Sequence, residues 1–317
     1  MAVKSIVPLR NTVANTEYGP TPVLWGGEGC PGGNWVEDFL QDPRLGYHFF
    51  DTFVDGAPSA SLTTSATTGS YGSWGLYAYA NAIVTDASVP GGVIQLQCGT
   101  TSHQGIALTK YAGAVQLASS NSNPIPGFMA FEARVALNFA VTTAASAYDA
   151  FVGLSDAGAP GSGKPITTTN NSLYNSCNLI GFQRIGSVGN DWSFVYQASG
   201  VAAVYPTNLQ TLINSVTGSN YTANQYVKLG FIYNPTPISA TLGSTTTGNS
   251  TVGPARPMIQ IFVNGQPAAA FLTAANVSSS NFPQGVMGPA LAIMNSSTAT
   301  NCSMYVDWVR VAQSNWQ

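Results

Sequence analysis

Alternation of apolar and polar side chains with a period of two is the feature that most constrains what this chain can fold into. It runs from Tyr47 almost to the end and is clearest over 128–140, where every second position from Met129 to Leu137 is apolar. This period places successive side chains on opposite faces of a strand. The ranges that carry it are 46–54, 74–85, 92–98, 128–140, 148–154, 178–185, 192–197, 226–233, 258–263, 268–272, 288–294 and 302–311. About a dozen short strands with turn signals between them predict an all-β chain, a two-sheet antiparallel jelly-roll sandwich.

Turn and loop signals separate these strands. The Asn264-Gly265 pair is the sharpest of them, because both residues tolerate positive φ, and it predicts a tight hairpin. Stretches rich in Ser, Thr, Gly and Asn at 57–73, 158–178 and 236–256 predict long surface loops that are ordered against their neighbours. A short helical turn is expected near 208–216.

Residues 1–45 differ from the rest and predict an extended N-terminal arm, followed by the sandwich over 46–317. Proline and glycine at 19–22 and 26–33 favour turns and extended backbone, since proline fixes φ and glycine relaxes it. One short helix is expected over 35–41. Such a segment builds no core of its own, so we expect it to lie either on its own sandwich or on a neighbouring chain.

Charge is scarce in this sequence. Only 7% of the 317 residues are charged, whereas the hydrophobic fraction of 44% is sufficient for a sizeable core. The ten lysines and arginines never cluster, and a basic stripe is needed to neutralise several phosphates, so we expect no nucleic-acid partner. No stretch approaches the ~18 apolar residues of a membrane span, and the start lacks the apolar core of a signal peptide. We therefore expect synthesis in a cytoplasm without export.

The cysteines and aspartates show no ligand spacing. The chain has four cysteines, at positions 30, 98, 177 and 302. They lie far apart without a CxxC pair, which argues against a zinc site and a disulfide-dense scaffold and favours buried free thiols. Asp149, Asp156 and Asp191 could in principle ligate calcium, but turn capping is the better interpretation of their spacing. We expect no metal site and no cofactor.

Five strand motifs resemble, in their order, those of the concanavalin A-like lectin/glucanase superfamily. They are FDTF at 50–53, FEARV at 131–135, FVGLSD at 151–156, IFVNGQ at 261–266 and YVDWVRV at 305–311. In that superfamily the corresponding segments are an opening strand, a long outer strand, the strand after it, an Asn-Gly hairpin and a closing strand. The resemblance covers roughly residues 47–312 and implies two facing antiparallel sheets, one of them concave.

The same resemblance provides a test for catalysis. The glucanase branch carries a Glu-x-Asp-x-x-Glu strand, and a retaining glycosidase needs two carboxyls about 5–5.5 Å apart. None of the four glutamates, at 17, 28, 37 and 132, begins such a motif. Of the two histidines, His48 lies in an aromatic strand and is expected to be a packed or edge residue. No nucleophile elbow or phosphate-binding loop occurs. We therefore expect no catalytic residues and no enzyme, with a glycoside hydrolase as the weakest alternative.

Tryptophans are the remaining candidates for binding. Trp74 and Trp308 lie within alternating strands and are expected in the core. Trp192 follows Asn190-Asp191 at the start of a strand, so it is the candidate for an exposed glycan contact. Trp25, Trp35 and Phe39 belong to the arm and are expected to bind a partner.

Two interpretations of function follow from these features. The first is a non-enzymatic structural virion protein, a bacteriophage capsid decoration or head-surface protein that attaches through its arm to the major capsid protein or another virion protein. This interpretation implies a location on the virion surface and a homo-oligomer, for which a trimer is expected. The second is a carbohydrate-binding adsorption module, of the tail-fibre or lectin-like kind, that binds a host-surface glycan.

Overall fold

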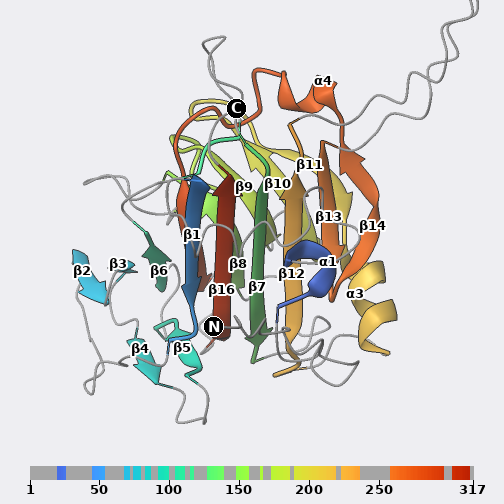
Figure 1. The fold of residues 1–317 in the computed structure, drawn as a ribbon. Helices are drawn as coiled ribbons and strands as arrows, with labels where there is room; N and C mark the ends of the chain where they lie inside the picture. Colours follow the sequence, from blue (N-terminus) through green and yellow to red (C-terminus); the bar gives the residue numbers. More distant parts are fainter. Residues whose placement is uncertain are drawn as a thin grey trace, which may run out of the picture.

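Two eight-stranded antiparallel sheets face each other (Figure 1). The structure is a computed structural model that describes residues 20–25, 45–53, 68–71, 74–79, 83–86, 92–99, 104–110, 115–117, 127–138, 148–156, 165–166, 173–185, 189–218, 223–235, 258–295 and 302–314. Sheet 1 runs in the order β14 (Gln266–Leu272), β13 (Ile259–Val263), β12 (Val227–Tyr233), β7 (Met129–Leu137), β16 (Ser303–Ser314), β5 (Ile94–Gln97) and β4 (Ile83–Asp86), and β1 (Gly46–Asp51) also pairs with β16. Sheet 2 runs in the order β11 (Val204–Asn208), β10 (Gly189–Gln197), β9 (Leu179–Ile185), β8 (Tyr148–Ser155), β15 (Gly288–Asn295), β6 (Gly105–Thr109), β3 (Trp74–Tyr79) and β2 (Thr68–Tyr71). This arrangement is the all-β, two-sheet antiparallel sandwich that the period of two predicts.

The core lies between the two sheets. Aromatic rings from both sheets meet there: Phe131 and Phe231 of sheet 1 lie 5.4 Å apart, and Phe231 also contacts Phe194 of sheet 2 at 5.5 Å between ring centroids. Trp74 is buried, as expected. The period of two produces this core, because it directs alternate residues of β7 and its neighbours into the layer between the sheets.

The central strands of both sheets are covered on their outer faces as well, so β7, β8, β9 and β15 are buried along their whole length. On sheet 2, Ile166 and Leu173 pack over the outward side chains of the central strands. These two residues belong to the range 158–178, so the described part of that loop is ordered against its neighbours, as predicted. On sheet 1, Leu24 and Trp25 of the arm cover the outer face.

The expected Asn264-Gly265 hairpin is present. β13 and β14 pair antiparallel on either side of it, and both turn residues have positive φ, 48° and 79°. The two positive values are those of a two-residue hairpin whose twist matches that of its strands.

Some strands differ from the sequence-based prediction. The range 74–85 is not one strand, because β3 belongs to sheet 2 and β4 to sheet 1. β2 lies inside the expected loop at 57–73, and β6 and β11 were not predicted. The motif at 131–135 lies in β7, which is a central strand of its sheet and not an outer one.

Helices are short in the described part of the chain. α1 (Pro22–Trp25) lies on the outer face of sheet 1 against β7 and β12 (Figure 1). α3 (Gln210–Thr217) confirms the helical turn expected near 208–216 and contacts one strand of each sheet, and α4 (Ala274–Val277) was not predicted. None of these helices has the length and apolar character needed to cross a bilayer. The helix expected over 35–41 lies outside the described residues.

Candidate binding site

Two clusters of polar side chains, each beside a glycine, stand out on the sandwich. One lies on the outer face of sheet 1, beneath α1, and is called the arm-docking site; its residues are Glu132, Gly230 and Arg310. The other lies at the end of sheet 2 where β8 finishes and β9 begins, and is called the loop-end site; its residues are Asp156, Asn178 and Gly285.

The arm-docking site follows from strand register. Gly230 of β12 and Arg310 of β16 are the direct partners of Glu132 on β7, so the three share one row across the sheet. Glu132 is 1% exposed, and its carboxylate accepts hydrogen bonds from the backbone N–H of Thr21 at 2.9 Å, from the Thr21 hydroxyl, and from the Trp25 indole Nε1 at 2.7 Å. One carboxylate therefore fixes both ends of the described arm segment.

Packing around Glu132 completes the docking. A Cβ on Gly230 would lie 2.6 Å from Cδ2 of Leu24, so the absence of a side chain leaves the space that Leu24 occupies. The guanidinium of Arg310 lies 4.3 Å from the centroid of the Trp25 ring, a cation–π contact. Burial raises the pKa of Glu132, and the hydrogen bonds from Thr21 and Trp25 oppose this rise.

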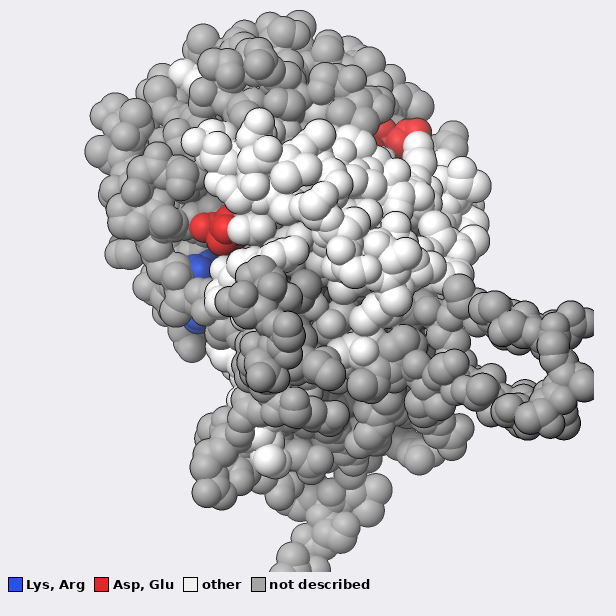
Figure 2. Space-filling view, turned by 90° about the horizontal axis from the view of Figure 1, so that it is seen from above, with Lys and Arg blue, Asp and Glu red and all other residues white. Residues whose placement is uncertain are grey.

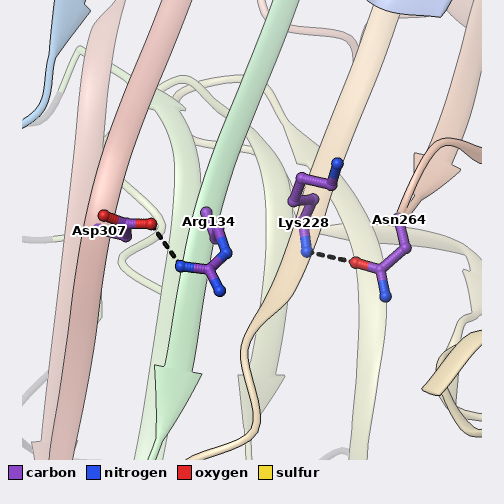
Figure 3. Close-up of polar contacts among 4 residues, drawn as sticks. All are labelled: Arg134, Lys228, Asn264 and Asp307. Atoms are coloured by element: carbon purple, nitrogen blue, oxygen red, sulfur yellow. Dashed lines mark hydrogen bonds and ion pairs between the residues drawn. The ribbon is translucent and has the colours of Figure 1, made fainter. Parts of the chain in front are cut away.

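A second charged row lies next to the first. Lys228 of β12 pairs with Arg134 of β7 in the register. Arg134 forms an ion pair with Asp307, and the backbone N–H of Lys228 donates to the Asn264 side-chain oxygen at 2.7 Å (Figure 3). Side chains that are distant in the sequence thus gather on one face, in a chain where charge is scarce. Arg134 and Asp307 pair with each other on this face, beside the row that holds the arm segment.

The loop-end site is built from an aspartate and an asparagine. Asp156 follows β8, and its two carboxylate oxygens accept hydrogen bonds from the backbone N–H of Asn178 at 2.7 Å and from Asn178 Nδ2 at 2.6 Å. The Asn178 side-chain oxygen in turn accepts from the backbone N–H of Ser199 at 3.2 Å and of Gln284 at 3.4 Å. The pair therefore joins three connecting segments at one end of the sandwich.

Gly285 packs directly against this pair. A Cβ there would lie 2.7 Å from Asn178 Nδ2 and 3.3 Å from Asp156 Oδ2, so any side chain would press on both polar groups. Asp156 and Asn178 are half-buried, and the neighbouring Val286 is exposed. Burial raises the pKa of the Asp156 carboxyl, and the hydrogen bonds from Asn178 oppose that rise. The site presents a carboxylate, an amide and a small apolar surface side by side.

The tryptophans expected to bind partners have other positions. Trp25 is 7% exposed and packs on its own sandwich, so it is not a free anchor for another chain. Trp192 is fully buried in the core between the sheets, which corrects its interpretation as an exposed glycan contact. Its strand face decides this, since Trp192 lies in the same alternation as Phe194 and Tyr196, which are also core residues. Trp35 and Phe39 lie outside the described residues.

Sequence reasoning missed the loop-end site. Asp156 was interpreted as a turn cap, and it does accept a backbone N–H, but its partners Asn178 and Gly285 come from distant segments. Asp191 makes a similar contact, accepting from Asn208 Nδ2 at 2.7 Å. His48 is a packed residue, as expected, and its Nε2 accepts from Arg310 Nε at 3.1 Å.

Comparison with known proteins adds similarity of fold only. No family model and no curated protein matches this sequence. A protein of unknown function from Shewanella oneidensis MR-1 is 10% identical, with a TM-score of 0.48 over 90% of this chain and 96% of that one. Peanut lectin, solved with a nine-residue peptide, is 11% identical, with a TM-score of 0.48 over 86% of this chain and 98% of that one. The carbohydrate recognition domain of Emp47p is 11% identical, with a TM-score of 0.42 over 86% and 99%.

Proposed function

We propose that this chain is a non-enzymatic, lectin-like binding protein whose loop-end site binds a neutral saccharide. The observation that carries the proposal is the half-buried Asp156–Asn178 pair, which three connecting segments hold in place beside Gly285. A carboxylate accepts hydrogen bonds from sugar hydroxyls, and an amide both donates and accepts, so adjacent hydroxyls of one ring can be paired in two directions. The exposed Val286 offers a contact for the apolar C–H surface of the ring.

The character of the surface supports a neutral ligand. Figure 2 views the molecule from the end at which β16 finishes, and the described atoms on this side are almost all uncharged. A contact between Gln116 Nε2 and the Gln284 carbonyl at 2.9 Å, and another between Gln116 N–H and Gln313 Oε1 at 2.9 Å, link the loop-end site to this end of β16. Little electrostatic steering is available there, so affinity has to come from neutral hydrogen bonds and apolar contact.

Titration of the protein with a panel of neutral mono- and oligosaccharides, followed by NMR or calorimetry, tests this proposal. We expect Asp156→Asn and Gly285→Leu each to weaken binding by tenfold or more. Asp191→Asn is the matched control, because it removes a carboxylate that also accepts a hydrogen bond from an asparagine amide, on the opposite end of the sheet. Its affinity should stay within twofold of the wild type. Absence of binding at millimolar sugar, or equal affinity in all variants, would contradict the proposal.

Assembly on a virion is the second candidate, supported by the same scarcity of surface charge. Contacts with the major capsid protein or another virion protein, and trimer formation, would then depend on neutral surfaces and be nearly insensitive to salt. Because Trp25 is used within the sandwich, the candidate contacts of the arm are Trp35 and Phe39. Sedimentation of the full chain and of a Trp35→Ala variant, at low and high salt, tests this role. A salt-independent oligomer that the substitution dissociates supports it, and a monomer at all concentrations opposes it.

A further inference from the structure

Cys98 and Cys302 lie directly opposite each other. The register of β5 and β16 pairs Gln97 with Ser303, and the next pair along the two segments is Cys98 with Cys302, whose backbones are joined by an N–H to carbonyl hydrogen bond of 2.9 Å. Both side chains belong to the core between the sheets, with exposed fractions of 2% and 1%. Opposed residues of a hydrogen-bonded antiparallel pair have Cα atoms ~5.5 Å apart, and this is within the range that a disulfide spans.

The surroundings of this thiol pair connect the two sheets. The Cys302 thiol donates to Oδ1 of Asn295 at 3.1 Å, and Nδ2 of Asn295 donates to the carbonyl of Gly99. Asn295 is the last residue of β15 in sheet 2, whereas Cys98 and Cys302 adjoin strands of sheet 1. Burial and the adjacent Cys302 thiol raise the pKa of Cys98 well above its ordinary value. Both cysteines are free thiols in this structure.

We propose that Cys98 and Cys302 form a reversible disulfide, which staples β5 to β16 when the chain meets a low-molecular-weight disulfide such as oxidised glutathione. One cysteine loses its proton and attacks the glutathione disulfide, which forms a mixed disulfide and releases one glutathione thiol. The second cysteine loses its proton, attacks the protein sulfur of the mixed disulfide and releases the second glutathione. Two electrons pass from the protein thiols to glutathione, and the two protons end on the released thiols.

Position explains how two buried thiols can react. Cys98 comes directly after the last residue of β5, and Cys302 directly before the first residue of β16. The ends of strands open more readily than their centres, so local opening of this one pair is sufficient for access. The closed loop would contain most of the sandwich, and the constraint on the unfolded chain would raise the melting temperature by about 5 °C.

Peptide mapping tests the disulfide, because trypsin places each cysteine in a peptide of its own. Cleavage after lysine and arginine, except before proline, leaves Cys30 in 11–44, Cys98 in 45–110, Cys177 in 135–184 and Cys302 in 229–310. The folded full-length protein is equilibrated with a series of oxidised-to-reduced glutathione ratios, alkylated, digested without reduction and analysed by mass spectrometry. We expect the peptides 45–110 and 229–310 to be recovered as one linked species, about 2 Da lighter than their sum.

Matched variants separate this pair from unspecific oxidation. Cys98→Ser and Cys302→Ser should each abolish the linked species and the rise in melting temperature. Cys177→Ser should keep both, because Cys177 is a buried thiol on the outer face of sheet 2, where its thiol donates to the Tyr174 carbonyl at 3.1 Å. Alkylation of Cys98 and Cys302 to the same extent as Cys177 at the most oxidising ratio would overturn the proposal. Links that involve all cysteines without preference would overturn it as well.

Discussion

The carboxylate of Glu132 and the indole Nε1 of Trp25 are joined by a hydrogen bond of 2.7 Å, although 106 residues stand between them in the chain. The same carboxylate accepts two further hydrogen bonds, from the backbone N–H and the hydroxyl of Thr21. Three donors converge on one buried carboxylate, and their hydrogen bonds oppose the rise in the pKa of Glu132 that burial causes. The arm segment 20–25 is thus held by one of the four glutamates, none of which begins a glucanase motif.

Glu132→Gln should detach this segment. A glutamine carries no charge, so the hydrogen bonds from Thr21 and Trp25 would lose their charge assistance, and the half-buried Arg310 would lose its counter-charge. We expect the free energy of unfolding to fall by about 3 kcal/mol, the usual cost of removing one partner of a buried charged network. Urea denaturation measures this loss, and hydrogen exchange of the Trp25 indole N–H reports the arm itself.

Asp307→Asn is the matched control for that substitution. It removes a carboxylate from the same face of sheet 1, but the Asp307 side chain is 16% exposed and contacts Arg134. We expect the free energy of unfolding to fall by about 1 kcal/mol or less, as for partly exposed ion pairs. The Trp25 indole N–H should remain protected from hydrogen exchange. Equal losses in the two variants, or a protected indole in Glu132→Gln, would show that Glu132 does not hold the arm.

Gly230→Ala should lower the free energy of unfolding mainly when the arm is present. The new Cβ would lie 2.6 Å from Leu24 Cδ2, whereas its closest contact within the sheet, the Phe131 carbonyl oxygen, is 3.0 Å away. In the full chain we expect overpacking to lower the free energy of unfolding by about 2 kcal/mol. In a chain that begins after Trp25 the loss should fall to less than half of that value. A double-mutant cycle from urea denaturation gives the difference, and the same penalty in both backgrounds would contradict the assigned contact.

The strength of alternation decided which strands could be predicted. β7 was predicted because its inward and outward positions differ in polarity, with Glu132 and Arg134 between apolar residues. β6 reads Gly-Ile-Ala-Leu-Thr and is buried at every position, so it shows no period of two. The split of 74–85 into β3 and β4 was not visible either, because the pattern of apolar residues does not record a change of sheet.

The candidate site was less predictable than the fold, for a physical reason. Asp156 and Asn178 stand at the two ends of a long connection, and Gly285 approaches them from another part of the chain. None of these residues belongs to a motif with fixed spacing, so only the folded backbone brings them together. The position of Trp192 could have been found, because counting by two from Phe194 places it on the core face.

His48 predicts a dependence of stability on pH. Its Nε2 accepts a hydrogen bond from Arg310, so it must be neutral, and burial together with this guanidinium lowers its pKa from 6.5 to about 4. A histidine with a lowered pKa contributes stability that is fully present above pH 6.5 and is lost as the pH falls through 4. We expect the wild type to lose more stability between pH 7 and pH 4 than His48→Gln, which keeps an acceptor but does not titrate. NMR titration of the imidazole measures the midpoint directly, and a value near 6.5 would refute this assignment.

Trp192 allows the clearest separation of a core residue from a binding residue. Its side chain is fully buried, its carbonyl accepts from the backbone N–H of Leu209 at 2.7 Å, and its indole N–H has no acceptor among the described residues. Trp192→Phe keeps most of the apolar volume and removes that unpaired donor, so it should cost about 1 kcal/mol, since an unsatisfied buried donor is itself unfavourable. Trp192→Ala creates a cavity and should cost about 3–5 kcal/mol.

Saccharide titration of the Trp192→Phe variant completes the comparison. A ring without access to solvent cannot stack on a sugar, so Trp192→Phe should bind the same saccharides as the wild type, with affinity within twofold. Gly285→Leu should show a large loss of affinity together with a fall in melting temperature, because its side chain would press on Asp156 and Asn178. If Trp192→Phe instead abolished binding without loss of stability, Trp192 would be a ligand contact, and the loop-end site would have to be given up as the place where the saccharide binds.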